Sequence, residues 1–303
     1  MVKVSIIVPI YNVELFIARC AVSLFEQTYD NIEYIFVNDN TKDKSVDELE
    51  KVVEKYFNRK DKIKILKHEK NEGVGKARLT GLLASNGEYV WFVDSDDWVE
   101  KNALELCKNS LESGVDLIMM NYIAEFENNS KQIDLPSMNV DNILKNELSP
   151  SLWKYIIKRD LLINNNILPI EGINYAEDFL FTAEMALVVK THFHVCNYLY
   201  HYNCYNSHSC MQNINTECLE HGARSAIKVY DFYKSKSQVV IHRRGILFML
   251  CKRYFALYYR EPDNSLLVEL KERIHECDRF WYVYLQFMPF FSNLLMRIYR
   301  HFV

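Results

Sequence analysis

The first 93 residues alternate short apolar runs with amphipathic segments, and this alternation leaves few folds open to the chain. The apolar runs predict strands over 4–8, 32–37, 63–66 and 89–93, and helical spacing predicts helices over 13–27, 46–57 and 73–83. Strands joined by helices are typical of a parallel sheet with right-handed crossovers. We therefore predict an α/β fold with a Rossmann-like, mostly parallel central sheet flanked by helices.

The fourth predicted strand ends at a dense group of acids, Asp94, Asp96 and Asp97. Its apolar residues are typical of a strand covered on both faces, and ligands bind outside the carboxyl ends of such strands. Clustered carboxylates raise one another's pKa unless a cation lies among them, and oxygen ligands suit Mg²⁺ or Mn²⁺. The alternative is an acidic turn in which Asp97 caps a helix beginning near Val99.

Polar residues also follow the first two strands: Tyr11 with Asn12, and Asp39. The carboxyl ends of parallel strands meet at one edge of a sheet, so these residues should lie near the acids. A nucleotide diphosphate would fit there, with the ring stacked on a base and Asp39 accepting a base N–H or a ribose hydroxyl. The alternatives are a core aromatic for Tyr11 and a turn former for Asp39.

The segment 73–77 is not a recognised phosphate loop. Lys70 stands where a Walker sequence has its first glycine, and Ala77 replaces the Ser or Thr. The third glycine of the dinucleotide fingerprint is also missing. The free N–H groups at this helix start, with Lys76 and Arg78, still favour an anionic ligand.

The second half of the sequence does not continue the regular alternation of strands and helices. We expect a helix over 100–111, a strand over 115–126, an exposed hairpin or loop over 127–140, helices over 150–162 and 179–190, a strand over 193–202, and helices over 219–233, 239–259 and 266–277. We divide the chain into a catalytic domain, 1–212, and a helical C-terminal region, 213–303. The catalytic domain comprises a nucleotide-binding half, about 1–126, and an acceptor half, about 127–212.

Composition excludes several classes of protein. The net charge of −4 does not favour nucleic acid, and 8 glycines and 6 prolines in 303 residues leave no flexible linker. The start shows no signal-peptide pattern and the 8 cysteines form no CxxC pair, so we expect reduced thiols in the cytoplasm. Cys204, His208 and Cys210 give only three nearby ligands, so zinc is not favoured.

The segment 280–300 is aromatic and basic, and Pro289 interrupts it, so we do not expect a membrane span. Two interpretations stay open. One is an interfacial helix pair pressing on anionic lipid at the inner face of the membrane. The other is a C-terminal helix packed on the protein or in a homodimer.

In their order along the chain, several segments together resemble the family 2 glycosyltransferases of the GT-A fold, of the bacterial surface-polysaccharide type. The matching segments are 8–12, 38–43, 71–81, 94–97, 152–154, 158–159 and 177–178. They cover about the first two thirds of the chain. The resemblance implies a GT-A catalytic domain, with the helical C-terminal extension outside it.

The resemblance also implies roles for individual residues. Donor-binding positions are Pro9, Tyr11, Asn12, Asp39, Arg78, Asp94 and Ser95, with Asp39 on the base and Asp94 on the ribose side. Asp96 of the DXD motif would bind Mn²⁺ or Mg²⁺, with Asp94 as a second candidate. His208 falls in a loop over the donor diphosphate and could contact the metal or the phosphate, but an ordinary polar loop histidine is the favoured interpretation.

Asp178 matches the catalytic base of the family, although without that pattern Glu177 and Asp178 would be ordinary first-turn acids of a helix. The family usually has two aspartates and a glycine-serine turn where this chain has Asn38, Asp39, Asn40 and Thr41. Thr80 replaces a common asparagine. These departures leave the nucleotide base, uridine or another, open.

The implied activity is inverting, metal-dependent transfer of a hexosyl or N-acetylhexosaminyl group. The donor would be a nucleotide-diphosphate sugar, with UDP favoured, and the acceptor a hydroxyl of a glycan or lipid-linked molecule. No Gln-x-x-Arg-Trp motif is present, so we expect non-processive addition. One alternative is a sugar nucleotidyltransferase, which would need a glycine-rich loop that 9–12 lacks. The other is a catalytically silent binding module.

Overall fold

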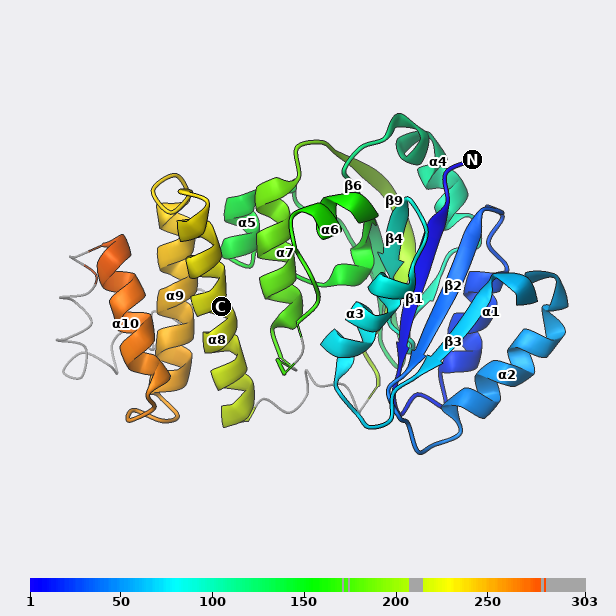
Figure 1. The fold of residues 1–303 in the computed structure, drawn as a ribbon, viewed down its shortest axis with the longest axis horizontal. Helices are drawn as coiled ribbons and strands as arrows, with labels where there is room; N and C mark the ends of the chain where they lie inside the picture. Colours follow the sequence, from blue (N-terminus) through cyan, green and yellow to red (C-terminus); the bar gives the residue numbers. More distant parts are fainter. Residues whose placement is uncertain (171, 174, 207–214, 279–280, 282–303) are drawn as a thin grey trace.

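The computed structural model describes residues 1–170, 172–173, 175–206, 215–278 and 281. A central sheet with helices on both faces fills one end of the molecule, and three helices stand side by side at the other end (Figure 1). This is the α/β architecture with a helical C-terminal region that the sequence predicts.

The first four strands form the parallel part of the sheet, in the order β3-β2-β1-β4. They are β1 (Val4–Ile10), β2 (Ile32–Asn38), β3 (Ile63–Lys67) and β4 (Tyr89–Phe92), joined by α1 (Ile17–Phe25), α2 (Ser45–Lys55), η1 (Phe57–Lys62) and α3 (Val74–Ala84). Every residue of β1, β2 and β4 is buried, which explains their continuous apolar runs. The predicted alternation of strands and helices is confirmed.

Two hydrophobic cores lie on the two faces of this sheet. Ile7 of β1 packs with Ala77 and Leu82 of α3 on one face, in the core that α7 also joins. Val8 of β1 packs with Leu24 of α1 on the other face. Figure 1 shows α3 on one side of the sheet and α1 with α2 on the other.

The rest of the sheet is mixed, and its order continues from β4 as β8-β6-β9-β5. These strands are β5 (Trp98–Val99), β6 (Leu117–Glu125), β8 (Tyr155–Lys158) and β9 (His192–Asn203), with β7 (Ser130–Ile133) as a hairpin partner of β6. β8 runs antiparallel to β4 and β6, whereas β9 runs parallel to β6.

The helix predicted over 150–162 is wrong. A short 3-10 turn, η2 (Leu152–Lys154), leads into β8, and α6 (Arg159–Asn164) follows. Tyr155, Ile156 and Ile157 are all buried, although successive side chains point to opposite faces of the sheet. In a strand covered on both faces, apolar and polar residues do not alternate, so the sequence pattern of such a short run does not distinguish a strand from a helix.

The remaining helices cover the second half and form the C-terminal array. They are α4 (Ala103–Ser113), α5 (Val140–Leu144), α7 (Glu177–Val188), α8 (Thr216–Ser235), α9 (Arg243–Tyr258) and α10 (Leu266–Cys277). The Tyr233 hydroxyl of α8 donates to the Ala183 carbonyl of α7 at 2.8 Å. The core around α7 continues through all three C-terminal helices, so this array and α7 share one apolar interior.

Within the described part of the chain, no helix combines the length and apolar character needed to cross a membrane. The aromatic and basic segment 280–300, apart from Trp281, lies outside the described residues. The membrane and dimer interpretations of that segment therefore stay predictions.

We expect Gly81→Ala to destabilise the fold, because a Cβ at residue 81 would lie 2.3 Å from Cγ2 of the buried Ile7. Overpacking of this kind costs about 1–3 kcal/mol, partly offset by the better helix propensity of alanine. Urea denaturation measures the loss. Leu83→Ala on the exposed side of α3 is the control, expected to change stability by less than about 0.5 kcal/mol. Equal stability of wild type and Gly81→Ala would contradict the close packing of α3 on β1.

Candidate active site

The residues predicted to hold a donor lie at the carboxyl ends of β1, β2 and β4, which are neighbours in the sheet. The Asp39 N–H donates to the Ile10 carbonyl at 3.0 Å, and the Asn12 N–H donates to the Thr41 hydroxyl at 2.9 Å. Pro9 lies inside β1, opposite Val37 of β2. The ends of β1 and β2 are thus tied into one edge.

Tyr11 and Asn12 project from this edge. Tyr11 is 46% exposed, so the alternative that it is a core aromatic is wrong. Asn12 has a φ of 54°, a left-handed conformation that asparagine adopts more readily than most residues. The turn after β1 therefore presents an aromatic ring to solvent beside the end of β2.

Asp39 is almost completely buried, and three protein groups rather than solvent hold its carboxylate. Oδ1 accepts from the Glu72 N–H at 2.8 Å and contacts the His68 ring at 2.7 Å. Oδ2 accepts from the Gly73 N–H at 2.8 Å. The His68 ring contacts the Thr80 hydroxyl at 2.9 Å on its other side. Asp39 thereby fixes the start of α3 to the end of β2.

The acids after β4 divide into two kinds. Asp97 is fully buried and accepts from the Tyr200 hydroxyl at 2.6 Å and from the Asn203 N–H at 2.7 Å. Burial raises its pKa, and the Asp96 and Asp94 charges raise it further. β5 follows the turn and α4 begins at Ala103, so the interpretation of Asp97 as a helix cap near Val99 is wrong. Its role is to fasten the turn to β9.

Asp94 and Asp96 are partly exposed, while Ser95 between them is buried. The Asn206 amide donates to Oδ2 of Asp96 at 2.7 Å. Burial and the neighbouring Asp94 charge raise the pKa of Asp96. A cation would relieve that repulsion, and two carboxylates give it oxygen ligands.

No group of three or more His, Cys, Asp or Glu side chains is gathered for a metal anywhere in the described residues. This donor set still fits Mg²⁺ or Mn²⁺, because such ions are usually held by one or two carboxylates plus substrate phosphates and water. His208 and Cys210 lie outside the described residues, so the weak zinc cluster with Cys204 and the role of His208 stay untested.

Arg78 connects the acidic turn after β4 to the predicted base. Its guanidinium is 4% exposed and donates to Asp94 at 2.8 Å, to Asp178 at 2.6 Å and to Glu177 at 3.2 Å. α7 begins at Glu177, so both of its acids point from the first turn toward α3. Acids from the end of β4 and from the start of α7 thus bind the guanidinium of Arg78, which lies 100 residues before Asp178 in the chain.

The electrostatics of Asp178 follow from this arrangement. Burial raises its pKa to about 7, the Arg78 charge opposes that rise, and the Glu177 and Asp94 charges add to it. A carboxylate that titrates near neutrality is suited to general-base catalysis at ordinary pH. The sequence identified Asp178 only through its match to the family pattern. Its ion pair with Arg78 could not be predicted, because the two residues are 100 positions apart in the chain.

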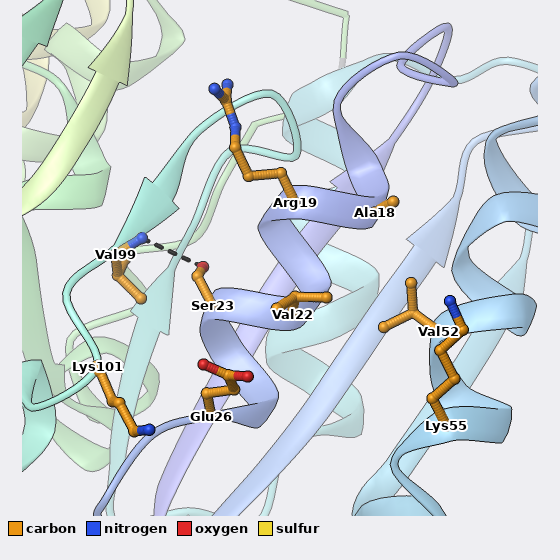
Figure 2. A pocket seen from close by; sticks show the side chains of 9 residues that line it. All are labelled: Ala18, Arg19, Val22, Ser23, Glu26, Val52, Lys55, Val99 and Lys101. Carbon is orange, nitrogen blue, oxygen red and sulfur yellow. Dashed lines mark hydrogen bonds between the residues drawn. The ribbon is translucent and has the colours of Figure 1, made fainter.

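A groove of about 430 Å³ lies behind the DXD turn, between α1, α2 and the turn around β5 (Figure 2). It contains none of the predicted donor or catalytic residues. Ser23 on its wall accepts from the Val99 N–H at 3.2 Å, and Arg19 donates to the Asp96 carbonyl at 3.3 Å. Arg19 also stacks on Trp98, with 3.5 Å between the guanidinium carbon and the ring centroid. Helix α1 therefore supports the acidic turn through Arg19 and Ser23.

Comparison with known proteins identifies the family. Residues 5–167 match the model of glycosyl transferase family 2. The chain belongs to this family. The putative glycosyltransferase EpsH of Bacillus subtilis is 30% identical over 231 residues, which make up 72% of this chain and 65% of EpsH. The chain thus spans less than two thirds of that relative's length.

Solved structures show the same fold. TarS 1-349 of Staphylococcus aureus, crystallised with UDP-GlcNAc, superposes with a TM-score of 0.68 at 22% identity, over 91% of this chain and 80% of TarS 1-349. The mannosyltransferase PcManGT of Pyrobaculum calidifontis, in complex with GDP-Man and Mn²⁺, superposes with a TM-score of 0.57 at 14% identity, over 99% of this chain and 83% of PcManGT. The GT-A fold predicted from the sequence is confirmed.

We expect Arg78→Met to destabilise the protein more at about pH 8 than at about pH 5. The folded-state pKa of Asp178 is raised, so stability falls as pH rises from the ordinary value of an aspartate toward about 7. Without Arg78 that pKa rises further, and the loss at high pH grows to about 2–4 kcal/mol. Chemical denaturation across pH measures this.

Arg273→Met is the matched control, because the Asp231 and Glu272 side chains that Arg273 pairs with are 51% and 62% exposed. It should cost less than about 1 kcal/mol at every pH. A pH-independent loss for Arg78→Met would show that Arg78 does not offset the three carboxylates.

Proposed function

We propose that this chain is an inverting, metal-dependent glycosyltransferase that moves a sugar from a UDP-sugar to an acceptor hydroxyl. The observation that carries the proposal is the single guanidinium of Arg78 bound to both Asp94 and Asp178. It sets the donor-side acids and a base titrating near neutrality a few ångströms apart. Membership of family 2 and the nucleotide-sugar complexes of TarS and PcManGT support it.

Asp178 is the proposed base. Its carboxylate takes the proton of the acceptor hydroxyl as that oxygen bonds to the anomeric carbon and the bond to the diphosphate breaks. A single displacement of this kind inverts the anomeric configuration. Arg78 holds the Asp178 carboxylate in place. The Asp178 side chain is 20% exposed, which leaves a path for the acceptor.

Asp96, with Asp94 as the second candidate, would hold Mn²⁺ or Mg²⁺. A bound dication supplies charge neutralisation to the diphosphate leaving group. Asn206 donates to one oxygen of Asp96 at 2.7 Å and orients this carboxylate for the proposed ion. Pro9, Tyr11, Asn12 and Ser95 are proposed to shape the donor side around these acids.

The uridine assignment rests on the hydrogen bonds of Asp39. Three of its roughly four acceptor positions are taken by the Glu72 and Gly73 amides and by His68. One position on Oδ2 has no partner among the described residues, and we propose that it accepts a hydrogen bond from the nucleotide base. Uracil offers a single ring N–H, whereas guanine offers a ring N–H and an amino group side by side and needs two acceptors.

Several further features are proposed from the sequence. We infer a catalytic domain over 1–212 and a helical region over 213–303, and transfer of one hexosyl or N-acetylhexosaminyl group per encounter. The acceptor would be a glycan or lipid-linked hydroxyl. A peripheral site at the inner face of the membrane, or a homodimer, would use the segment 280–300.

We expect Asp178→Asn to abolish transfer while preserving donor binding. The amide accepts no proton, so turnover should fall by about 10²–10⁴-fold. Release of UDP from UDP-sugars measures turnover, and the thermal shift with Mn²⁺ and UDP measures binding. Asp160→Asn, with a 77% exposed side chain on α6, is the control and should retain both. Transfer by Asp178→Asn at the wild-type rate would show that the base is misassigned.

We expect Mn²⁺ with UDP to stabilise the protein more than Mn²⁺ with GDP, because Asp39 has one acceptor position left. A nucleotide at about 100 times its dissociation constant adds about 2.7 kcal/mol of stability. Thermal unfolding with each nucleotide, with and without metal, measures the difference. A larger shift with GDP would contradict the uridine assignment. A shift with nucleoside triphosphates alone would favour a nucleotidyltransferase, and no shift at all a silent module.

A further inference from the structure

Arg19 of α1 binds two segments of the chain that meet at the acidic turn. Its guanidinium donates to the Asp96 carbonyl at 3.3 Å and to the Tyr205 hydroxyl at 2.8 Å. Asp96 lies in the turn after β4, whereas Tyr205 follows β9 and is 186 residues beyond Arg19 in the chain. One side chain of α1 thus holds both segments.

Stacking restrains the guanidinium of Arg19 from one face. It lies over the Trp98 ring, with 3.5 Å between its carbon and the ring centroid. The Trp98 ring stacks in turn on the His201 ring of β9, with 4.9 Å between the centroids and 12° between the planes. A planar guanidinium can stack on an aromatic ring while its N–H groups donate from the edge. The stack therefore leaves those N–H groups available for Asp96 and Tyr205.

The same two segments are joined by the hydrogen bond from the Asn206 amide to Oδ2 of Asp96, at 2.7 Å. Arg19 fixes the backbone of the acceptor residue through the Asp96 carbonyl. It also fixes Tyr205, the residue immediately before the donor. Phe16, at the start of α1, contacts the Tyr205 ring edge-on with 6.3 Å between centroids. Helix α1 therefore holds both ends of the bond that orients the Asp96 carboxylate.

Asn203 at the end of β9 makes a second bridge between the two segments. Its amide donates to the Asp96 carbonyl at 3.2 Å, and its Oδ1 accepts from the Tyr205 N–H at 3.1 Å. Because this bridge is independent of α1, loss of Arg19 should loosen the arrangement without unfolding it. The consequence should appear in the direction of the Asp96 carboxylate.

The direction of a carboxylate matters when it holds a small dication. Mg²⁺ requires near-ideal octahedral geometry and is commonly held by only one or two carboxylates. Groups that orient a metal ligand from outside the site typically change metal affinity or activity by about 10–100-fold. Asp96 and Asp94 are the only carboxylates proposed for the ion here. Freedom of the Asp96 side chain to rotate would therefore weaken binding directly.

We propose that Arg19 is a positioning residue that sets the direction of the Asp96 carboxylate, through the Asp96 carbonyl and the segment 205–206. This inference rests on the proposed function. It assigns Arg19 no contact with the donor or with the ion. Arg19 should therefore control the affinity for Mn²⁺ or Mg²⁺, and have little effect on the rate of transfer once the ion is bound.

The test is the affinity of Arg19→Met for Mn²⁺ in the presence of UDP, measured from the electron paramagnetic resonance signal of unbound Mn²⁺. Both ends of the orienting hydrogen bond lose their anchor, so the dissociation constant for Mn²⁺ should rise by about ten-fold. Release of UDP from a UDP-sugar, titrated with Mn²⁺, gives a second readout. Half-saturation should rise by the same factor, whereas turnover at saturating Mn²⁺ should stay within about three-fold of wild type.

Tyr205→Phe tests the same link by removing one oxygen atom. The ring can keep its contact with Phe16, and Tyr205 is 37% exposed, so the fold should be retained. The affinity for Mn²⁺ should fall by about three-fold, as expected for one hydrogen bond. Added to Arg19→Met, Tyr205→Phe should lower it no further, because both changes break one interaction.

Lys55→Met is the control. Lys55 is an exposed cation on α2 that lines the same groove as Arg19 (Figure 2). It should leave the affinity for Mn²⁺ and the turnover unchanged.

The outcomes separate this inference from the proposed function. Wild-type affinity for Mn²⁺ in Arg19→Met, even with reduced turnover at every Mn²⁺ concentration, would overturn the role of Arg19 and leave the proposed glycosyl transfer standing. If Arg19→Met does not fold, Tyr205→Phe decides: wild-type affinity overturns the role, and weakened affinity supports it. Wild-type protein that binds no Mn²⁺ in the presence of UDP would reject the proposed metal dependence, and this inference with it.

Discussion

The guanidinium of Arg78 is the interaction on which the site depends. Three carboxylates, from Asp94, Glu177 and Asp178, reach it from two segments that share no neighbouring sequence. Each would repel the others at these distances without a cation between them. Because Arg78 is on α3 and α3 packs on β1 through Gly81, the sheet sets the position of the base as well as that of the donor acids.

The acidic turn shows how one sequence cluster is divided between structure and chemistry. Asp97 is withdrawn into the interior, where Tyr200 and Asn203 of β9 satisfy it. Asp94 and Asp96 stay partly exposed, and each has one oxygen bound by a side chain of the protein. A fully buried carboxylate is tolerable only with such hydrogen bonds, so the packing of β9 on the turn is what allows Asp97 to be buried there.

The sequence predicted the parallel half of the sheet because its signals are local. Four short apolar strands alternate with three helices along the chain, and right-handed crossovers restrict how they can be arranged. It failed at β8, where Tyr155, Ile156 and Ile157 are buried on both faces and show no period. At the site, strand ends brought Tyr11, Asp39 and Asp94 to one edge. His68, Tyr200 and the bond between Arg78 and Asp178 depend on contacts across the fold, which no spacing in the chain encodes.

Burial explains why these long-range contacts tune the chemistry. Burial raises the pKa of Asp178 to about 7, whereas the Arg78 charge and a hydrogen bond from the Leu152 N–H of η2 lower it. Arg78, always protonated, favours the ionised form of this carboxylate. Proton acceptance by Asp178 is thus a property of the packing of α3, η2 and α7 around it, and a substitution in any of the three elements can alter it.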